Sequence, residues 1–209
     1  MAKARSVAPP SPPPARRPPR VDPRVAQTKR LVKETTLDLI AEVGFEGTNI
    51  ELIAERSGVS RTTIYRHWPD PAALYLEAFD PPSDDVALPP PTGRTLDDLR
   101  TYLQHVADRL NDDRYAAALA AQIDKSQRDS AYRAAHFRYA AERNASGVQL
   151  FRDGIADGTF ARTIDPEHET ELVLSYLVYA RVVRHRHLDH AEVDRLYHEV
   201  RARCGSTRR

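Results

Sequence analysis

Six side chains that can hydrogen bond to nucleic acid lie close together between residues 61 and 67. They are Arg61, Thr62, Thr63, Tyr65, Arg66 and His67. Arginine, threonine and histidine can reach base edges in a major groove, and all of these side chains can bind phosphate oxygens. Ile64 and Trp68 lie four residues apart, which places both apolar side chains on one side of a helix. The segment therefore predicts a short helix with an apolar back and a polar flank that suits a DNA groove.

Two short helices around a tight turn, residues 48–68, would position this flank. Thr48 can cap the first helix, and Glu51, three residues later, can complete a capping box. Gly58 can adopt the left-handed conformation that ends a helix, and Ser60 can cap the next helix. Pro69 ends that second helix, because the residue before a proline is kept out of the helical region. This order of signals predicts a helix-turn-helix.

A helical hairpin with a solvated outer face is the alternative interpretation of the same stretch. Ala54 is small where two helices would cross closely, and Gly58 stands where the turn needs a positive φ. Val59 and Ile64 are apolar and would anchor the second helix on the first. The combination of a small residue, a turn glycine, apolar anchors and a polar outer face favours DNA binding over the hairpin.

Four blocks of this region resemble, in the same order, the tetracycline-repressor (TetR) family of bacterial transcription regulators. They are AEVGFEGT (41–48), IAERSGVS (53–60), TIYRHWP (63–69) and AALY (72–75). The resemblance spans about Thr28 to Phe79, and beyond residue 80 it fades to a likeness of architecture. It implies an all-α fold, in which an N-terminal three-helix helix-turn-helix domain precedes a larger C-terminal helical domain for ligand binding and dimerisation.

The resemblance also assigns roles to residues. Arg61, Thr62 and Arg66 match the positions that face the groove, whereas Tyr65 and His67 match positions that contact the DNA backbone. Thr48 matches a phosphate contact at the start of the second helix, where backbone N–H groups also point outward. The complete candidate DNA-binding set is Thr48, Ser60, Arg61, Thr62, Thr63, Tyr65, Arg66 and His67. Where the family often has a phosphate-binding lysine this chain has Pro71, so a contact from the fourth helix is in doubt.

Composition places the chain among soluble globular proteins, with 41% hydrophobic and 29% charged residues in 209. The net charge is only +1, but residues 1–33 hold nine lysines and arginines against one acid, which fits a chain whose front meets phosphate. We expect no membrane span and no signal peptide, because the apolar runs are too short. Cys204 is the single cysteine, so an internal disulfide is impossible and a reducing cytoplasm is expected.

Two proline-rich stretches predict the division of the chain. Residues 1–21 form a Pro/Arg-rich arm that we expect to be disordered, either raising non-specific DNA affinity or serving only as a solvated leader. Residues 22–80 form the DNA-binding domain and residues 81–94 a linker. Residues 95–209 form the C-terminal effector-binding and dimerisation domain.

Capping signals and apolar spacing predict about nine helices and no strand. Asp22-Pro23 and Asp165-Pro166 each read as an N-cap followed by a first-turn proline, as does Asp70-Pro71. We expect Thr95 to cap its helix and Phe45 to pack under the helix-turn-helix. Outside the helix-turn-helix, the longer helices are expected at 24–43, 95–110, 114–125, 130–156, 166–183 and 191–203.

A small-molecule effector is implied by the resemblance, which places a cavity at the centre of the C-terminal helices. Five polar residues on those helices are candidates for its lining: Tyr102, His105, Gln122, Arg133 and His136. The alternative for each residue is a place on a solvated face. The cavity itself is better supported than any named residue, because the cores of helical bundles are common ligand sites.

A metal site and a catalytic site are both disfavoured. His187 and His190, with Asp189 between them, lie in a segment that also holds Arg184 and Arg186, whose charges would repel a metal ion. We expect this segment to close a helix, where cations interact well with the dipole. No nucleophile elbow, P-loop, dinucleotide fingerprint or HExxH pattern occurs, so we expect no enzyme activity and no cofactor.

The sequence therefore predicts a homodimeric transcription regulator, most simply a repressor that an effector releases from operator DNA. The apolar stripes at 172–183 and 193–200 fit the intersubunit four-helix bundle that the resemblance implies, although burial within one subunit would also explain them. Two alternatives remain open. One is a helical enzyme with an accessory DNA-binding head, and the other is an architectural DNA-binding protein that senses no ligand.

Overall fold

The computed structural model of the chain describes residues 23–80 and 88–206. The predicted arm at 1–21, the Asp22 cap and the first half of the predicted linker, residues 81–87, lie outside these described residues. Within them the protein is all-α, and the one bridge of strand type joins Phe160 to Gly205. Among the described residues, no helix combines the length and the apolar character that crossing a membrane requires.

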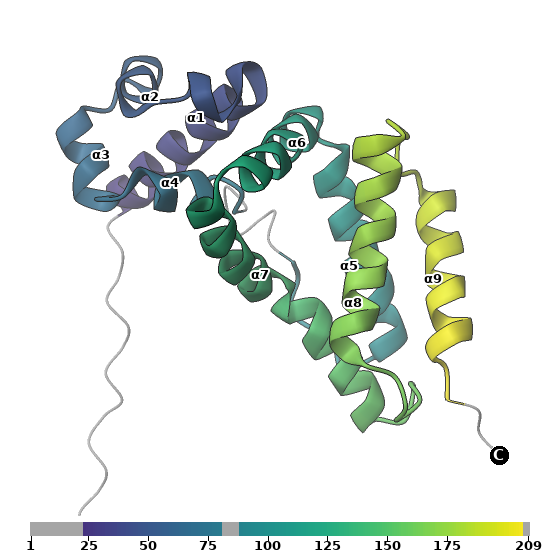
Figure 1. The fold of residues 1–209 in the computed structure, drawn as a ribbon. Coiled ribbons are helices and arrows are strands. Elements are labelled where there is room, and N and C mark those ends of the chain that lie inside the picture. Colours follow the sequence, from purple (N-terminus) through teal and green to yellow (C-terminus); the bar gives the residue numbers. More distant parts are fainter. Residues whose placement is uncertain (1–22, 81–87, 207–209) are drawn as a thin grey trace, which may run out of the picture.

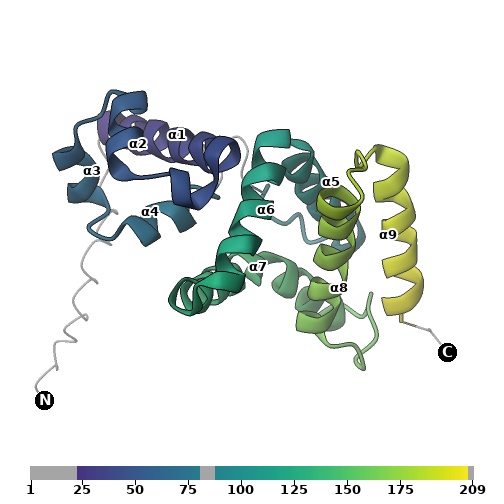
Figure 2. The same ribbon diagram turned by 45° about the horizontal axis from the view of Figure 1, so that its top comes forward.

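Nine α-helices and one π-helical turn make up the described fold (Figure 1). The helices are α1 (Pro23–Gly47), α2 (Ile50–Ser57), α3 (Arg61–His67), α4 (Pro71–Glu77), α5 (Thr95–Asn111), α6 (Asp113–Arg128), α7 (Ser130–Ala156), α8 (Pro166–Val178) and α9 (His190–Cys204), with the π turn η2 (Tyr179–Val183) after α8. Helices α1–α4 form a small unit at one end, and α5–α9 form the larger bundle, as both views show (Figures 1 and 2). Helix α6 packs along α1 and joins the two units.

Two apolar clusters match these two units. The smaller cluster holds the helix-turn-helix together and consists of Val32, Leu39, Ile50, Ile53, Ile64, Trp68 and Leu74. The larger cluster runs through α5–α9 and reaches back to α1 and α4. Because the core of the larger cluster crosses the boundary between the units, the N-terminal unit is fixed to the bundle by packing as well as by the chain.

Phe45 corrects one expectation. Gly44 has a φ of 70° and interrupts the helical geometry of α1 just before Phe45. After this turn the Phe45 ring packs edge to face on Tyr75 of α4 and Tyr132 of α7, not under the helix-turn-helix. The residue therefore belongs to the larger cluster.

The cap at the start of α5 is a second correction. Thr95 does not cap the helix, because its hydroxyl donates to the Asp157 carboxylate at the end of α7, 2.6 Å away. The preceding turn is instead held by Asp98, whose carboxylate accepts from the backbone N–H groups of Thr92 and Gly93 at 2.9 and 3.1 Å. Thr95 thus ties the start of α5 to the end of α7.

The helix boundaries otherwise follow local signals closely. Helix α7 spans the predicted residues 130–156. The predicted helix 166–183 ends as an α-helix at Val178 and continues as a π-helical turn to Val183. Asp165 and Asp70 cap their helices as expected, each accepting from a backbone N–H in the first turn.

Candidate nucleic-acid interface and ligand cavity

The start of α2 is set one residue later than the sequence predicts. Asn49 is the N-cap, and its side chain accepts from the Leu52 N–H at 2.8 Å. Thr48 is buried, and its hydroxyl donates to the Gly44 carbonyl at 2.7 Å, so the predicted Thr48–Glu51 capping box is wrong. The reason is a local bond of another kind: threonine hydroxyls often donate to the carbonyl four residues earlier, as Thr48 does here at the turn of Gly44. Glu51 instead pairs with Arg61 of α3, with Nη1 and Oε1 3.2 Å apart.

The turn between α2 and α3 follows the prediction. Gly58 ends α2 with a φ of 69°, a left-handed conformation that suits glycine. Ser60 then caps α3, and its hydroxyl oxygen accepts from the Thr63 N–H at 3.2 Å. These two local devices fix the angle at which α3 leaves α2.

The back of α3 is anchored in the small core. Ile64 is fully buried and Trp68 is 1% exposed. The Trp68 indole N–H donates to the Glu77 carboxylate at 2.9 Å, and the ammonium of Lys29 lies 5.5 Å from the centre of its ring. Contacts from α1 and α4 therefore hold α3 from behind.

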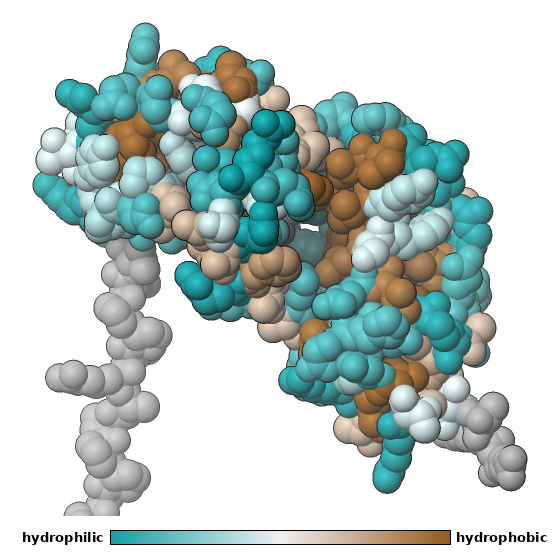
Figure 3. All heavy atoms as spheres, in the orientation of Figure 1, coloured by the Kyte–Doolittle hydropathy of each residue, from teal (hydrophilic) through white to brown (hydrophobic). Residues whose placement is uncertain are grey.

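The outer flank of α3 faces solvent at the edge of the small unit, away from α5–α9 in both views (Figures 1 and 2). Arg61, Thr62, Tyr65 and Arg66 are exposed, and Thr63 and His67 are half-buried. Space-filling spheres show this end of the molecule as largely hydrophilic (Figure 3). The structure thus brings together seven of the eight candidate DNA-binding residues, Ser60 included, on one outward surface.

Thr48 is the member of the set that this surface excludes. Its hydroxyl already bonds to Gly44, and its carbonyl accepts from the Tyr75 hydroxyl at 3.0 Å. At the start of α4, Pro71 occupies the first helical position behind the Asp70 cap and offers neither an N–H nor a charge. At the start of α2, the groups that remain to bind a phosphate are backbone N–H groups of the first turn.

A cavity of about 440 Å³ lies in the bundle, between the end of α4 and helices α5–α8. Four of the five predicted residues line it: Tyr102, His105, Gln122 and His136. Arg133 does not, because its guanidinium donates to the carbonyls of Ser126 and Gln127 at the end of α6, at 2.6 and 2.8 Å. Its role in the structure is to satisfy the end of a helix, as basic side chains commonly do.

Arg109 and Asp80 are cavity residues that the sequence reasoning missed. Arg109 Nη2 donates to the carbonyls of Phe79 and Asp80, just after α4, at 3.0 and 3.1 Å. The guanidinium carbon lies 4.4 Å from the ring centre of Tyr115. The signal that could have found Arg109 is its spacing, since it follows Tyr102 by seven residues on α5 and so shares a helix face with it.

The environment of the cavity alters two pKa values. Burial, aided by the charge of Arg109, lowers the pKa of His105. Burial raises the pKa of Tyr132 to about 12. The Asp80 carboxylate accepts from the Tyr139 hydroxyl and lies 4.0 Å from the Lys33 ammonium.

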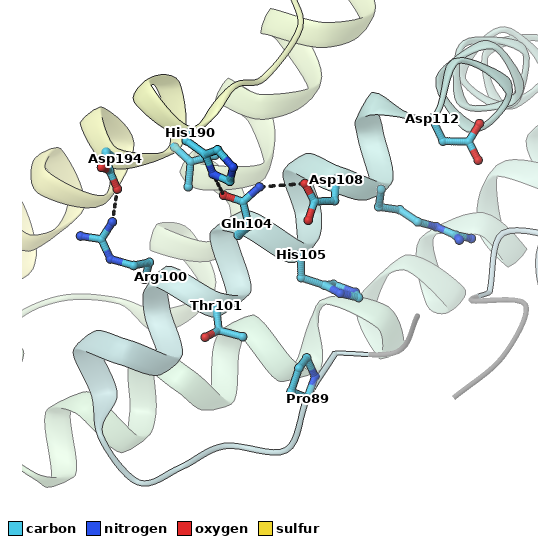
Figure 4. A pocket seen from close by; sticks show the side chains of 11 residues that line it. Pro89, Arg100, Thr101, Gln104, His105, Asp108, Asp112, His190 and Asp194 are labelled. Atoms are coloured by element: carbon cyan, nitrogen blue, oxygen red, sulfur yellow. Dashed lines mark hydrogen bonds and ion pairs between the residues drawn. The ribbon is translucent and has the colours of Figure 1, made fainter. Parts of the chain in front are cut away.

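A second, wider groove of about 850 Å³ runs between α5 and the start of α9 (Figure 4). Its polar side chains are largely paired with one another. Gln104 bonds to His190 at 3.0 Å and to Asp108 at 2.7 Å, and Arg100 pairs with Asp194. This groove therefore reads as a polar seam between two helices.

The histidine segment begins where the helical turn η2 ends, because Arg184 is the C-cap of η2, and the rest of the segment leads into α9. His187 lies in the loop between η2 and α9, and His190 is the first residue of α9. Within the described part of the chain, no three histidine, cysteine, aspartate or glutamate residues gather as they would around a metal ion.

The two C-terminal apolar stripes differ from each other. The stripe on α9, with Val193 and Val200, is buried inside the subunit. The apolar residues of α8 and η2 are divided. Val173, Leu177 and Ala180 are buried inside the subunit, whereas Leu172, Tyr179 and Val183 are 41%, 53% and 58% exposed. Figure 3 shows hydrophobic residues along the course of α8.

Comparison with known proteins supports this picture over the described length. The family model described as "Tetracyclin repressor-like, C-terminal domain" matches residues 89–200, and the one described as "Bacterial regulatory proteins, tetR family" matches residues 34–78. YdeS of Bacillus subtilis (strain 168), an uncharacterized HTH-type transcriptional regulator, is 27% identical over 165 residues, which cover 77% of this chain and 81% of YdeS.

Solved structures share the fold. The TetR family transcription regulator SCO0332 superposes with a TM-score of 0.67 at 22% identity, covering 84% of this chain and 97% of SCO0332. A putative TetR-family transcriptional regulator from Rhodococcus sp. gives the same TM-score at 19% identity, covering 85% of this chain and 98% of that protein.

Proposed function

This chain belongs to the TetR family of DNA-binding transcription regulators, and from that premise we propose that it is a homodimeric repressor which a small-molecule effector releases from its operator. The observation that carries the proposal is the two-sided character of α3. Ile64 and Trp68 are buried behind it, while cations and hydroxyls cover its outer flank.

The contacts that we propose follow from this flank. Arg61, Thr62 and Arg66 reach base edges, because they are exposed and carry groups that match those edges. Tyr65 and His67, together with Ser60 and Thr63 at the start of the helix, bind phosphates. The Thr48 hydroxyl is already bonded to Gly44, so we propose that the backbone N–H groups at the start of α2 bind the neighbouring phosphate instead.

Dimerisation is proposed through α8. Leu172, Tyr179 and Val183 leave an exposed apolar stripe of helical spacing, which a second copy would cover. Two copies related by a twofold axis would place two α3 helices in successive major grooves of a near-palindromic operator.

Because its target is chromosomal DNA, we propose that the protein works in the cytoplasm. We propose that residues 22–80 form the DNA-binding domain and residues 95–209 the effector-binding and dimerisation domain, with residues 81–94 as the linker between them.

Release by an effector is proposed to act through Arg109. This side chain lines the cavity and holds the carbonyls that follow α4. Helix α4 in turn holds the start of α2 through the bond from Tyr75 to the Thr48 carbonyl. A ligand that binds better to an arrangement with α4 displaced would shift the population away from the DNA-binding state.

The experiment that tests the function starts from the full-length protein and a pool of random duplexes. Selection of bound DNA should yield one near-palindromic site, preferred over bulk DNA by about a thousandfold or more. Replacing Tyr65 and Arg66 together with alanine should weaken binding to that site and flatten its salt dependence. Arg128→Ala, which removes an exposed cation on α6, is the matched control and should change neither.

Two results would contradict the proposal. If the double variant bound the site with unchanged affinity and unchanged salt dependence, Tyr65 and Arg66 would not make the contacts assigned to them. Selection that returns no preferred sequence would favour an architectural DNA-binding protein instead.

A further inference from the structure

The wall of the 440 Å³ cavity is mostly apolar and carries flat rings. Val106, Leu119 and Leu174 supply aliphatic surface from three different helices. Tyr102, Tyr115 and His136 contribute aromatic rings to the lining. The volume falls within the range of about 300–1,000 Å³ that is usual for small-molecule sites. A ligand with a rigid, ring-shaped, apolar body matches this wall.

Two charged side chains line the cavity, and both have protein partners. Of the described residues that line it, Asp80 and Arg109 are the two that carry a full charge at neutral pH. Each is held by protein partners: Asp80 by Tyr139 and Lys33, and Arg109 by the two carbonyls after α4. The lowered pKa of His105 keeps its imidazole uncharged near pH 7. The two charged side chains of the lining are therefore opposite in sign, and both are already engaged by protein groups.

Gln122 supplies one specific polar feature. Its side chain is 1% exposed, and Nε2 donates to the Tyr132 hydroxyl at 3.2 Å. The other amide atom, Oε1, is buried and has no hydrogen-bond partner among the described residues. Buried amide oxygens are nearly always hydrogen bonded, and the space beside Gln122 is the cavity that it lines. Oε1 has almost no accessible surface, so a donor on a bound molecule would complete this bond after a small rotation of the amide toward the cavity.

We propose that the cavity binds an uncharged molecule with an apolar body of one or two fused rings and an O–H or N–H group that donates to Gln122 Oε1. This inference rests on the proposed effector function of the same cavity and adds the chemical class of the effector. A carboxylate in the same place would face Oε1 with acceptor atoms, and Arg109, the one cation among the described lining residues, is already bonded to the carbonyls of Phe79 and Asp80.

Three probes of similar size test the proposal on the full-length protein at pH 7. They are 2-naphthol, which is neutral and has a donor, 2-methoxynaphthalene, which lacks the donor, and 2-naphthoate, which is an anion. Direct titration by calorimetry or intrinsic fluorescence should rank 2-naphthol first. The methoxy compound should bind about fivefold more weakly, the equivalent of one neutral hydrogen bond, and naphthoate more weakly still.

Single substitutions test whether Gln122 and the cavity wall determine the affinity for these probes. Gln122→Met should reduce 2-naphthol affinity about fivefold, to that of the methoxy compound, and leave the methoxy compound unchanged. Gln127→Met, an exposed glutamine on the same helix, is the control and should change neither. Ala140→Leu adds volume to the cavity wall and should weaken both neutral probes.

Four results would contradict the proposed ligand class. Naphthoate binding as tightly as naphthol, equal binding of the two neutral probes, failure of all three to bind, or binding that Ala140→Leu leaves intact would each overturn the proposal. The comparison of probes on the unaltered protein decides the matter even if Gln122→Met does not fold. Operator release is measured separately: 2-naphthol that binds without releasing DNA would contradict the repressor mechanism but not the ligand class.

Discussion

The ring of Phe45 packs edge to face on the ring of Tyr132, with their centres 5.2 Å apart and their planes at 66°. Phe45 belongs to the last part of α1, beside the helix-turn-helix, whereas Tyr132 lies in the first turn of α7. The Tyr132 hydroxyl also accepts from Gln122, which lines the cavity. One aromatic contact and one hydrogen bond therefore connect the DNA-binding unit to a cavity residue.

Phe45→Leu tests how much this contact stabilises the fold. The variant keeps a buried apolar side chain but loses both edge-to-face pairs, the one with Tyr132 and the one with Tyr75. We expect the free energy of unfolding to fall by about 2 kcal/mol in urea titrations. Phe137→Leu, at a ring that is 66% exposed, is the control and should change it by less than about 0.5 kcal/mol. Equal losses would show that the pairing contributes nothing of its own.

Asn49→Ala tests the position of the cap on α2. Loss of the bond from Asn49 Oδ1 to the Leu52 N–H should cost about 1 kcal/mol of stability. Glu51→Gln, the partner in the capping box that the sequence predicted, should be nearly neutral, because Glu51 makes an exposed ion pair with Arg61. Thermal unfolding monitored by circular dichroism measures both. A larger loss of stability in Glu51→Gln than in Asn49→Ala would support the Thr48–Glu51 capping box predicted from the sequence.

Local chemistry accounts for the parts of the fold that the sequence predicted well. Gly58 and Ser60 act within a few residues of themselves, and so do the Asp-Pro starts of α4 and α8. The polar flank of α3 was predictable for the same reason, since a spacing of four residues decides which side chains share a face.

The misplaced residues depend on contacts between helices or on unusual backbone geometry, which the local helix signals do not contain. Thr48 and Asn49 are both competent caps, and the carbonyl freed by the turn at Gly44 decides between them. Thr95 bonds to the end of α7 because tertiary packing brings that acceptor near. Arg133 bonds to Ser126 and Gln127 because the short turn between α6 and α7 folds the start of α7 back onto the end of α6. Arg109 went unnoticed because its partners are backbone carbonyls 29 and 30 residues away.

Arg109→Met should loosen α4 without altering the recognition surface. The change removes the two bonds from the guanidinium to the carbonyls of Phe79 and Asp80, which leaves those carbonyls without this donor. We expect faster amide hydrogen exchange in α4, read by mass spectrometry, and unchanged exchange in α9. Arg128→Met, on the exposed face of α6, serves as the control. Unaltered exchange in α4 would argue against Arg109 as the link from cavity to DNA-binding unit.

Leu172→Glu combined with Val183→Glu tests the proposed dimer surface. Both side chains are exposed in the single subunit, so the subunit itself should keep its helical content and thermal stability. Two carboxylates in an apolar interface would be costly to bury, so the dimer should dissociate at least tenfold more readily in sedimentation experiments. Ala131→Glu, at an exposed position on α7, should leave association unchanged. A double variant that remains as dimeric as the parent would place the interface elsewhere.

Cys204 gives a prediction about pH. Its thiol is fully buried, and burial, reinforced by the nearby Glu169 carboxylate, raises its pKa to about 12 from an ordinary value of 9.0. Above pH 9 the unfolded chain therefore loses this proton while the folded chain keeps it. The contribution to stability is complete below pH 9 and is lost as the pH rises toward 12.

Two measurements check this prediction. Because the thiolate is the reactive form, the native thiol should react with a disulfide reagent at pH 8 at least about a hundredfold more slowly than the thiol of the chain in denaturant. Urea titrations between pH 8.5 and 10.5 should show a decline in stability that Cys204→Ser reduces, since serine does not ionise in this range. Comparable native and denatured reaction rates, or an identical decline in the serine variant, would mean that this thiol is accessible or that other groups dominate the alkaline transition.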